Sequence, residues 1–219
     1  MISVLLVDDQ PLVRAGLRVV LAEPDGFRVV GECGDGAAAL SAVESGPPVD
    51  VVLMDVRMRG IDGITATRGL HERGGPPVLV LTTFDDDEVL WGAIEAGAAG
   101  FVLKEASAEE LIAATRAVAR GGSWLDPAVT PRVLEVTRRT ALPRRREASR
   151  AGALTDREME VLRRMATGAS NPEIAATLVV SEATVKTHVA RVLTKLGLTN
   201  RVQAALVAYR AGLIDVGPD

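Results

Sequence analysis

The chain has 219 residues, of which 47% are hydrophobic and 25% are charged, with 21 Gly, 11 Pro and 1 Cys. This balance is typical of globular proteins and excludes intrinsic disorder, a collagen-like repeat and a disulfide scaffold. The net charge of −4 is unevenly distributed: residues 1–126 carry 10 basic and 20 acidic residues, whereas residues 127–219 carry 15 and 9. We therefore expect the two parts to meet different partners.

The compartment is predicted from what the sequence lacks. Cys33 has no second cysteine to pair with, which favours a reducing environment. The apolar run 2–7 ends at Asp8 and has no basic residue before it. It is also much shorter than the roughly 20 apolar residues of a membrane span. We therefore expect a cytoplasmic protein with no membrane partner.

Up to residue 120, short apolar runs alternate with amphipathic stretches. The runs are rich in Val and Leu and are typical of buried parallel strands. They cover residues 4–7, 28–31, 51–54, 78–81 and 100–103, and helices are expected over 11–21, 36–45, 63–73, 88–96 and 107–120. Ser107 and Glu110 form a capping box at the start of the last helix. The alternation predicts an α/β fold with a doubly wound, five-stranded parallel sheet over residues 1–121.

The pattern changes after Gly121-Gly122. Residues 122–153 are rich in arginine, contain three prolines and read as a basic interdomain linker, with one helix expected over 131–140. Residues 154–219 are rich in Ala, Leu and Val and predict a small all-α domain. Thr155 with Glu158 forms a second capping box, and Ser181 is a further N-cap.

Polar residues follow four of the predicted strands. Asp8 and Asp9 come after the first strand, Asp55 after the third, Thr82 after the fourth and Lys104 after the fifth. The carboxyl ends of parallel strands lie at one edge of the sheet, so these groups are expected to meet there. Three crowded carboxylates favour a bound cation, Mg²⁺ or Mn²⁺ rather than zinc. Together with a hydroxyl and an ammonium, they predict a site for phosphoryl chemistry.

The alternative for any single strand-end acid is a solvated loop or a helix cap. Asp62, Asp85, Asp86, Asp87 and Glu88 fit that interpretation. Solvated loops or helix caps explain much less well why polar residues stand at several strand ends in succession, with a lysine at the last of them.

These residues resemble the receiver domain of bacterial response regulators over about residues 1–121. The resemblance rests on Asp8-Asp9, Asp55 within Leu53–Met58, Asp62-Gly63, Thr82 and Lys104. It implies that Asp55 accepts a phosphoryl group from a sensor histidine kinase, and that Asp8, Asp9, Asp55 and the backbone carbonyl of Arg57 bind the metal. It also implies that Thr82 and Phe101 form a switch pair and that Lys104 pairs with a phosphate oxygen.

In the back part, residues 172–178 and 181–196 predict a helix, a tight turn and a second helix. This is the helix-turn-helix arrangement, whose second helix enters the major groove. The apolar residues that fall at the spacing expected for a buried helix face are Ile174, Ala175, Leu178, Val185, Val189, Val192 and Leu196. The opposite face carries Glu182, Thr184, Lys186, Thr187, His188, Arg191 and Lys195, suited to phosphates and base edges. The alternative is an ordinary solvated helix face, because residues 152–219 hold eight basic and seven acidic residues.

Residues 154–214 resemble a LuxR-type DNA-binding domain through Leu154–Glu158, Ser170–Ala175, Ser181–Val189 and Asn200–Ala204. With the receiver, the whole chain resembles a NarL/FixJ-type response regulator. The resemblance implies that Lys186 and Thr187 reach base edges, and that Thr184, His188 and Arg201 lie on or near phosphates; Arg191 belongs to the same face. For His188 alone, the alternative is a surface histidine. Ala190 stands where relatives often have a polar reader, so its contact would be apolar, such as to a thymine methyl.

The expected function is a transcription regulator switched by phosphorylation, which is not an enzyme beyond hydrolysis of its own phosphoryl group. The expected partners are a sensor histidine kinase, promoter DNA, a second copy of the chain through residues 200–211, and RNA polymerase as a further candidate. Two alternatives remain. One is a phosphorylation-independent regulator with a relic pocket. The other is a Mg²⁺-dependent phosphohydrolase with an aspartyl nucleophile, which would want an acid where Arg57 stands.

Overall fold

A computed structural model describes residues 1–83, 87–139 and 153–214. The chain divides into two compact units, Met1–Ala119 and Arg120–Asp219. The expected linker is therefore counted with the second unit. Asp85 and Asp86, and the linker arginines from Arg144 to Arg150, lie outside the described residues.

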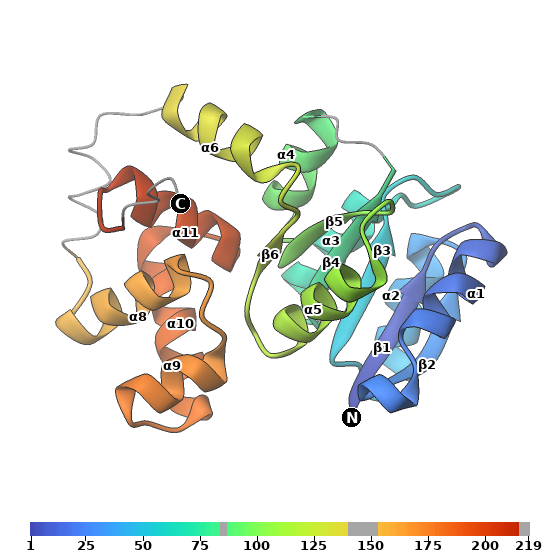
Figure 1. Cartoon of the computed structure of the whole chain (residues 1–219), viewed down its shortest axis with the longest axis horizontal. Helices are drawn as coiled ribbons and strands as arrows, with labels where there is room; N and C mark the ends of the chain where they lie inside the picture. Colours follow the sequence, from blue (N-terminus) through green and yellow to red (C-terminus); the bar gives the residue numbers. More distant parts are fainter. Residues whose placement is uncertain (84–86, 140–152, 215–219) are drawn as a thin grey trace. The chain divides into compact units, whose positions relative to one another are not determined.

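The first unit is built on five parallel strands, which lie side by side in Figure 1. They are β1 (Ile2–Val7), β2 (Phe27–Cys33), β3 (Val51–Asp55), β4 (Val78–Thr82) and β5 (Gly100–Leu103). Within this unit their order is β2-β1-β3-β4-β5, and every neighbouring pair is parallel. All five residues of β3 and of β4 are buried, as expected for strands covered on both faces. The predicted doubly wound sheet is confirmed.

Helices cover both faces of this sheet (Figure 1). They are α1 (Pro11–Val20), α2 (Gly36–Ser45), α3 (Gly63–Glu72), α4 (Asp87–Glu95) and α5 (Ala108–Ala119), with a short 3₁₀ turn, η1 (Glu23–Asp25), before β2. The strand order reverses direction at β1, because the chain moves outward to β2 and then back past β1 to β3. With right-handed crossovers, this puts α2, α3 and α4 on one face and α1 with α5 on the other. The reversal is the switch point beside which such sheets bind ligands.

The second unit is mainly helical. A short strand, β6 (Trp124–Leu125), precedes α6 (Thr130–Arg139), which matches the expected linker helix. The helices α8 (Asp156–Ala166), α9 (Asn171–Leu178), α10 (Glu182–Leu196) and α11 (Arg201–Arg210) follow. The Thr155–Glu158 capping box and the Ser181 N-cap are both formed, so these predictions are confirmed. The predicted Ser107–Glu110 box of the first unit is formed as well.

Helices α8, α9, α10 and α11 enclose an apolar core. Val161, Leu162 and Met165 of α8 meet Ile174 and Leu178 of α9 there. The other buried members are Ala175, Val185, Val192, Leu196, Ala204, Val207 and Ala208, and Val189 packs against them. The predicted core residues therefore lie inside, and the opposite face of α10 is left at the surface.

The turn between α9 and α10 contains an unusual residue. Val179 has a φ of 54°, and among the described residues it is the one non-glycine with a positive φ. Its side chain is 90% exposed. A β-branched residue in this left-handed region is strained, so the turn is tight at a cost in stability.

Among the helices in the described part of the chain, none combines the length and the apolar character that a membrane crossing requires.

Candidate functional site

The register of the sheet brings the strand-end residues to one edge. Val7 pairs with Met54, so Asp8 and Asp55 follow at the same level on neighbouring strands. Asp55 pairs with Leu81, which places Thr82 one residue further along the next strand. Thr82 pairs with Leu103, directly before Lys104. The predicted convergence therefore follows from backbone pairing.

Lys104 lies between two of the carboxylates. Its Nζ is 2.5 Å from Oδ2 of Asp8 and 3.1 Å from Oδ1 of Asp55. Asp8 and Asp55 are both buried, and Asp9 is half-buried at the rim. One ligand oxygen from each of the three aspartates lies within 4.8 Å of the others.

The electrostatics of Asp55 reflect this crowding. Burial raises the pKa of the Asp55 carboxyl above its ordinary value, and the charge of Asp8 raises it as well. The ammonium and the hydrogen bond of Lys104 act in the opposite direction and lower the pKa. Burial has the largest effect on this pKa. Three carboxylates also face a single lysine, so their negative charge is not fully compensated. A cation at this place would supply the missing positive charge.

The donor set fits a hard divalent cation. All three side chains offer carboxylate oxygens, which Mg²⁺ and Mn²⁺ prefer. Asp9 and Arg57 also line one open hollow of about 450 Å³, together with Val56, Met58, Arg59, Asp62 and Ile64. The hollow leaves room for water or for an incoming group beside Asp9. Arg57 and Asp9 therefore border the same hollow.

The start of α3 closes around the end of β3. A Cβ atom on Gly63 would lie 1.9 Å from the backbone oxygen of Asp55, so only glycine allows this approach. Asp62 is the N-cap of α3, and its carboxylate accepts a hydrogen bond from the backbone N–H of Thr65 at 2.7 Å. The interpretation of Asp62 as a helix cap is confirmed.

The remaining predicted residues of this pocket are buried in the neighbouring strands. Thr82 ends β4, and its backbone oxygen accepts a hydrogen bond from the N–H of Lys104 at 2.8 Å. Phe101 lies on β5 opposite Val80, and its ring is already inside in this structure.

A second group of predicted residues lies on the exposed face of α10. Lys186, Thr187 and Arg191 line an open hollow of about 710 Å³ with Ala190, Thr194 and Lys195. The Thr187 hydroxyl donates to the carbonyl of Ala183 at 3.0 Å. Toward a partner, Thr187 therefore offers its methyl group and oxygen lone pairs, because its proton is already used. Three basic side chains, those of Lys186, Arg191 and Lys195, are thus presented together with small apolar groups.

Thr184 and His188 lie elsewhere on the same helix. The Thr184 hydroxyl is 2.8 Å from the hydroxyl of Ser181 in the N-terminal cap. His188 is half-buried, and within the described residues its Nδ1 is buried without a hydrogen-bond partner. Neither residue lines the hollow formed by Lys186, Thr187 and Arg191.

Arg201 is placed differently from the expectation. Its side chain is 5% exposed. It donates to the backbone oxygens of Ala169 and of Gly121, the latter at 2.5 Å, and to Oδ1 of Asn171 at 3.2 Å. Burial lowers the pKa of the guanidinium to about 10, so it stays charged at neutral pH. The structure does not bring Arg201 to the exposed face of α10, because backbone oxygens of its own unit take its donors.

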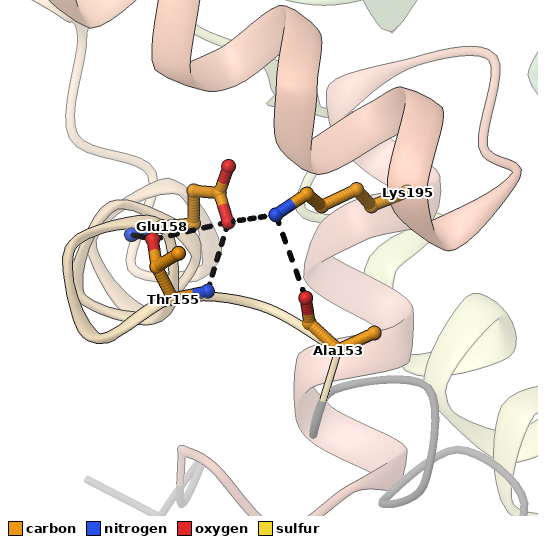
Figure 2. A network of polar contacts seen from close by, with 4 residues as sticks. All are labelled: Ala153, Thr155, Glu158 and Lys195. Atoms are coloured by element: carbon orange, nitrogen blue, oxygen red, sulfur yellow. Dashed lines mark hydrogen bonds and ion pairs between the residues drawn. The ribbon is translucent and has the colours of Figure 1, made fainter.

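The end of α10 is tied to the start of α8 by a polar network shown in Figure 2. Nζ of Lys195 is 2.6 Å from Oε2 of Glu158 and 3.5 Å from the oxygen of Ala153. The same Glu158 oxygen accepts the backbone N–H of Thr155 at 2.8 Å. These hydrogen bonds lower the pKa of Glu158 to about 2, and the bond from Lys195 has the largest effect. The sequence indicated the capping box but not the ion pair, because the partners are far apart along the chain.

Family models match both units. The response regulator receiver domain matches residues 4–116, and the LuxR family of bacterial regulatory proteins matches residues 152–208. The chain therefore belongs to the response regulators that join a receiver domain to a LuxR-type DNA-binding domain, the NarL/FixJ type. This class consists of transcriptional regulators rather than enzymes.

Similar proteins match the chain over nearly its full length. The transcriptional regulatory protein LiaR of Bacillus subtilis is 42% identical over 221 residues, covering 98% of this chain and all of that one. The probable transcriptional regulatory protein NarL of Mycobacterium tuberculosis is 38% identical over 215 residues, covering 98% of this chain and 96% of that one.

Solved structures of response regulators also match the chain over nearly its full length. The response regulator ChrA of a heme-sensing two-component system is 42% identical, with a TM-score of 0.51 over 97% of this chain and 98% of its own. The RcsB chain in a structure of two RcsB dimers bound to two parallel DNAs is 27% identical. The match has a TM-score of 0.57 and covers 97% of this chain and 99% of that one.

Proposed function

We propose that this response regulator is switched by phosphorylation of Asp55 and that the phosphorylated form binds promoter DNA through α10. The observation that carries the proposal is the meeting of three carboxylates and Lys104 at one edge of the sheet. We also propose the three-part division, with a receiver over 1–121, a linker over 122–153 and a DNA-binding domain over 154–219.

The donor is a phosphohistidine of a sensor histidine kinase. A carboxylate oxygen of Asp55 forms the new O–P bond while the P–N bond of the donor breaks, and the imidazole nitrogen keeps that electron pair. A Mg²⁺ or Mn²⁺ ion held by Asp8, Asp9, Asp55 and the carbonyl of Arg57 would neutralise charge on the phosphoryl oxygens.

The side chains of the pocket prepare the reaction. Lys104 now bridges Asp8 and Asp55, so its ammonium is placed to transfer one contact from a carboxylate to a phosphoryl oxygen. Thr82 is one residue beyond the register partner of Asp55 and supplies a hydroxyl donor. Phosphorylation adds about −1.5 to −2 charges here. Movement of Thr82 toward that charge, with Phe101 behind it, would shift β4 and β5 between two states.

On DNA, Lys186 and Thr187 are proposed to read base edges, Arg191 to contact base edges or phosphates, and Thr184 and His188 to contact phosphates. Lys186, Thr187 and Arg191 share the hollow on the exposed face of α10. Ala190 lies between them and fits a thymine methyl group. Arg201 is not proposed as a DNA contact, because its side chain is buried.

We propose a homodimer as the DNA-bound form, with α11 as the candidate interface. Two copies related by a two-fold axis match paired half-sites about one helical turn apart. Val202 and Leu206 of α11 are buried in this structure, whereas Ala205 and Arg210 are half-buried.

The direct test of the acceptor is incubation with radiolabelled acetyl phosphate and Mg²⁺. The wild-type chain should take up label, which alkaline hydroxylamine releases, and Asp55→Asn should take up almost none. Asp62→Asn is the control, because this cap residue should leave labelling intact. Equal labelling of wild type and Asp55→Asn would contradict the proposal. Steady release of phosphate without regulation of DNA binding would favour the phosphohydrolase instead.

A further inference from the structure

The loop between β1 and α1 carries Asp8 and Asp9, and one side chain of α1 points back onto it. Nη1 of Arg14 donates a hydrogen bond to the backbone oxygen of Asp8 at 2.5 Å. The carbonyl that accepts this bond belongs to the peptide that joins Asp8 to Asp9. Because a peptide unit is planar, holding its oxygen also fixes the direction in which the N–H and the Cα of Asp9 lie.

Arg14 is itself held by the neighbouring strand. Its Nε donates to Oε2 of Glu32 on β2 at 3.1 Å, and the two side chains are only 18% and 23% exposed. The Glu32 carboxylate, which Arg18 also contacts, offsets part of the positive charge that Arg14 brings near the cation site.

The two aspartates of the loop are held in different ways. The Asp8 carboxylate is fixed directly, because Oδ1 accepts the N–H of Gln10 at 2.8 Å and Oδ2 accepts from Lys104 at 2.5 Å. Among the residues that the structure describes, none forms a hydrogen bond or an ion pair with the Asp9 carboxylate. The direction of the Asp9 side chain therefore depends on the backbone that carries it.

We propose that Arg14 is a positioning residue for the divalent-cation site: by holding the Asp8–Asp9 peptide against β2, it directs the Asp9 carboxylate toward the carboxylates of Asp8 and Asp55. This inference rests on the proposed function, because it assigns a role toward the cation that phosphorylation would use. Outer residues of this kind typically change metal affinity by 10–100-fold when they are removed.

Arg18 provides a matched control. It lies one turn further along α1 and also contacts the Glu32 carboxylate. No contact joins Arg18 to the Asp8 backbone among the hydrogen bonds of the described residues. Replacing either arginine by methionine removes a contact with Glu32, but only Arg14→Met releases the Asp8 carbonyl.

The experiment measures the affinity of the full chain for Mn²⁺ by quantifying free Mn²⁺ with electron paramagnetic resonance. Competition with Mg²⁺ then gives the affinity for that ion. Thermal unfolding without metal is recorded alongside. We expect Arg14→Met to weaken Mn²⁺ binding about tenfold or more, and Arg18→Met to stay within about twofold of wild type. Phosphorylation of Arg14→Met by acetyl phosphate should recover at saturating Mg²⁺, because the defect lies in binding the cation.

Equal Mn²⁺ affinity in wild type and Arg14→Met would overturn the proposal, whatever happens to the melting temperature. An equal loss in Arg14→Met and Arg18→Met would overturn it too, since the ion pair with Glu32 would then be the cause. If Arg14→Met fails to fold, Arg14→Lys replaces it. A lysine has one donor nitrogen and cannot reach both Asp8 and Glu32 as the guanidinium does, so Arg14→Lys should bind Mn²⁺ more weakly than wild type and Arg18→Met. Equal Mn²⁺ affinity in Arg14→Lys and wild type would overturn the proposal in that case. A wild-type chain that binds neither Mn²⁺ nor Mg²⁺ would contradict the proposed function itself.

Discussion

Nζ of Lys104 lies 3.1 Å from Oδ1 of Asp55, so the charged end of β5 is already in contact with the end of β3 before any phosphoryl group arrives. This ion pair lowers the pKa of Asp55, but burial raises it more strongly. Three carboxylates face this one ammonium, so the pocket is incompletely neutralised and suited to accept a further cation. Lys104 and that cation would act on the same oxygens, which makes their competition measurable.

Lys104→Met should tighten binding of Mg²⁺ to the unphosphorylated chain. Removing a nearby positive charge relieves repulsion, which is about 4 kcal/mol for two unit charges about 4 Å apart at an effective dielectric of about 20. We therefore expect the affinity for Mg²⁺ to rise by about tenfold or more. Titration calorimetry or competition with Mn²⁺ would measure it. The same variant should lose the response to phosphorylation, because no ammonium remains to hold a phosphoryl oxygen. Weaker Mg²⁺ binding in Lys104→Met would show that the lysine supports the cation instead of competing with it.

The Glu158–Lys195 pair in Figure 2 predicts a pH dependence of stability. Folding lowers the pKa of Glu158 from 4.5 to about 2. The stabilisation is therefore fully present above about pH 5 and is lost as the pH falls toward 2. Urea unfolding of wild type and Glu158→Gln should show the largest difference near neutral pH and a shrinking one on acidification. Glu160→Gln, at an exposed ion pair of the same helix, should differ little from wild type at any pH. A difference for Glu158→Gln that stays constant down to pH 2 would contradict this assignment.

Val179→Gly should stabilise the protein. Valine at a φ of 54° is strained by about 1–2 kcal/mol, and glycine adopts this conformation without strain. After the larger entropy loss of glycine on folding, we expect a gain of about 0.5–1 kcal/mol in the free energy of unfolding. Val19→Gly is the counterpart, because this exposed valine lies in regular helix and its replacement should destabilise. If both variants lose stability in urea titrations, the turn is not strained as described.

Lys186→Ala and Arg144→Ala should affect DNA binding in different ways. The probe is a duplex that the wild-type chain enriches from a random-sequence pool, compared with a scrambled duplex. Lys186→Ala should reduce the preference for the enriched duplex, at a cost of about 1–3 kcal/mol. Arg144→Ala, in the basic linker, should weaken binding to both duplexes alike and reduce the salt slope by about 1. Fluorescence anisotropy at several salt concentrations separates the two effects. Equal losses of preference would contradict the assignment of Lys186 to base edges.

Much of the receiver pocket could be predicted from the sequence, and physics explains why. Five apolar runs separated by amphipathic stretches leave few alternatives to a parallel sheet, and in such a sheet the residue after each strand must lie at one edge. Asp8, Asp55, Thr82 and Lys104 therefore come together from strand order alone. Helix caps such as Ser107 and Thr155 were equally predictable, because their partners are three residues away.

Other features depend on packing between distant segments. Arg201 has the sequence context of a DNA contact, yet it lies inside because the chain folds the backbone oxygens of Ala169 and Gly121 around it. Arg14 and Glu32 meet only because α1 packs on β1 and the sheet brings β2 beside β1, and their spacing along the chain does not reveal this. The basic charge of the second half lies largely in the linker, so charge counting pointed to DNA but not to the residues that read it.

The central claim is that a phosphoryl group on Asp55 controls DNA binding. The most direct measurement is the affinity of the full chain for the enriched duplex, by fluorescence anisotropy, before and after treatment with acetyl phosphate and Mg²⁺. We predict that treatment strengthens binding by wild type about tenfold or more, a coupling within the usual 1–3 kcal/mol, and leaves Asp55→Asn unchanged. Unchanged affinity of the wild type after treatment, despite confirmed labelling of Asp55, would contradict the account and identify the pocket as a relic.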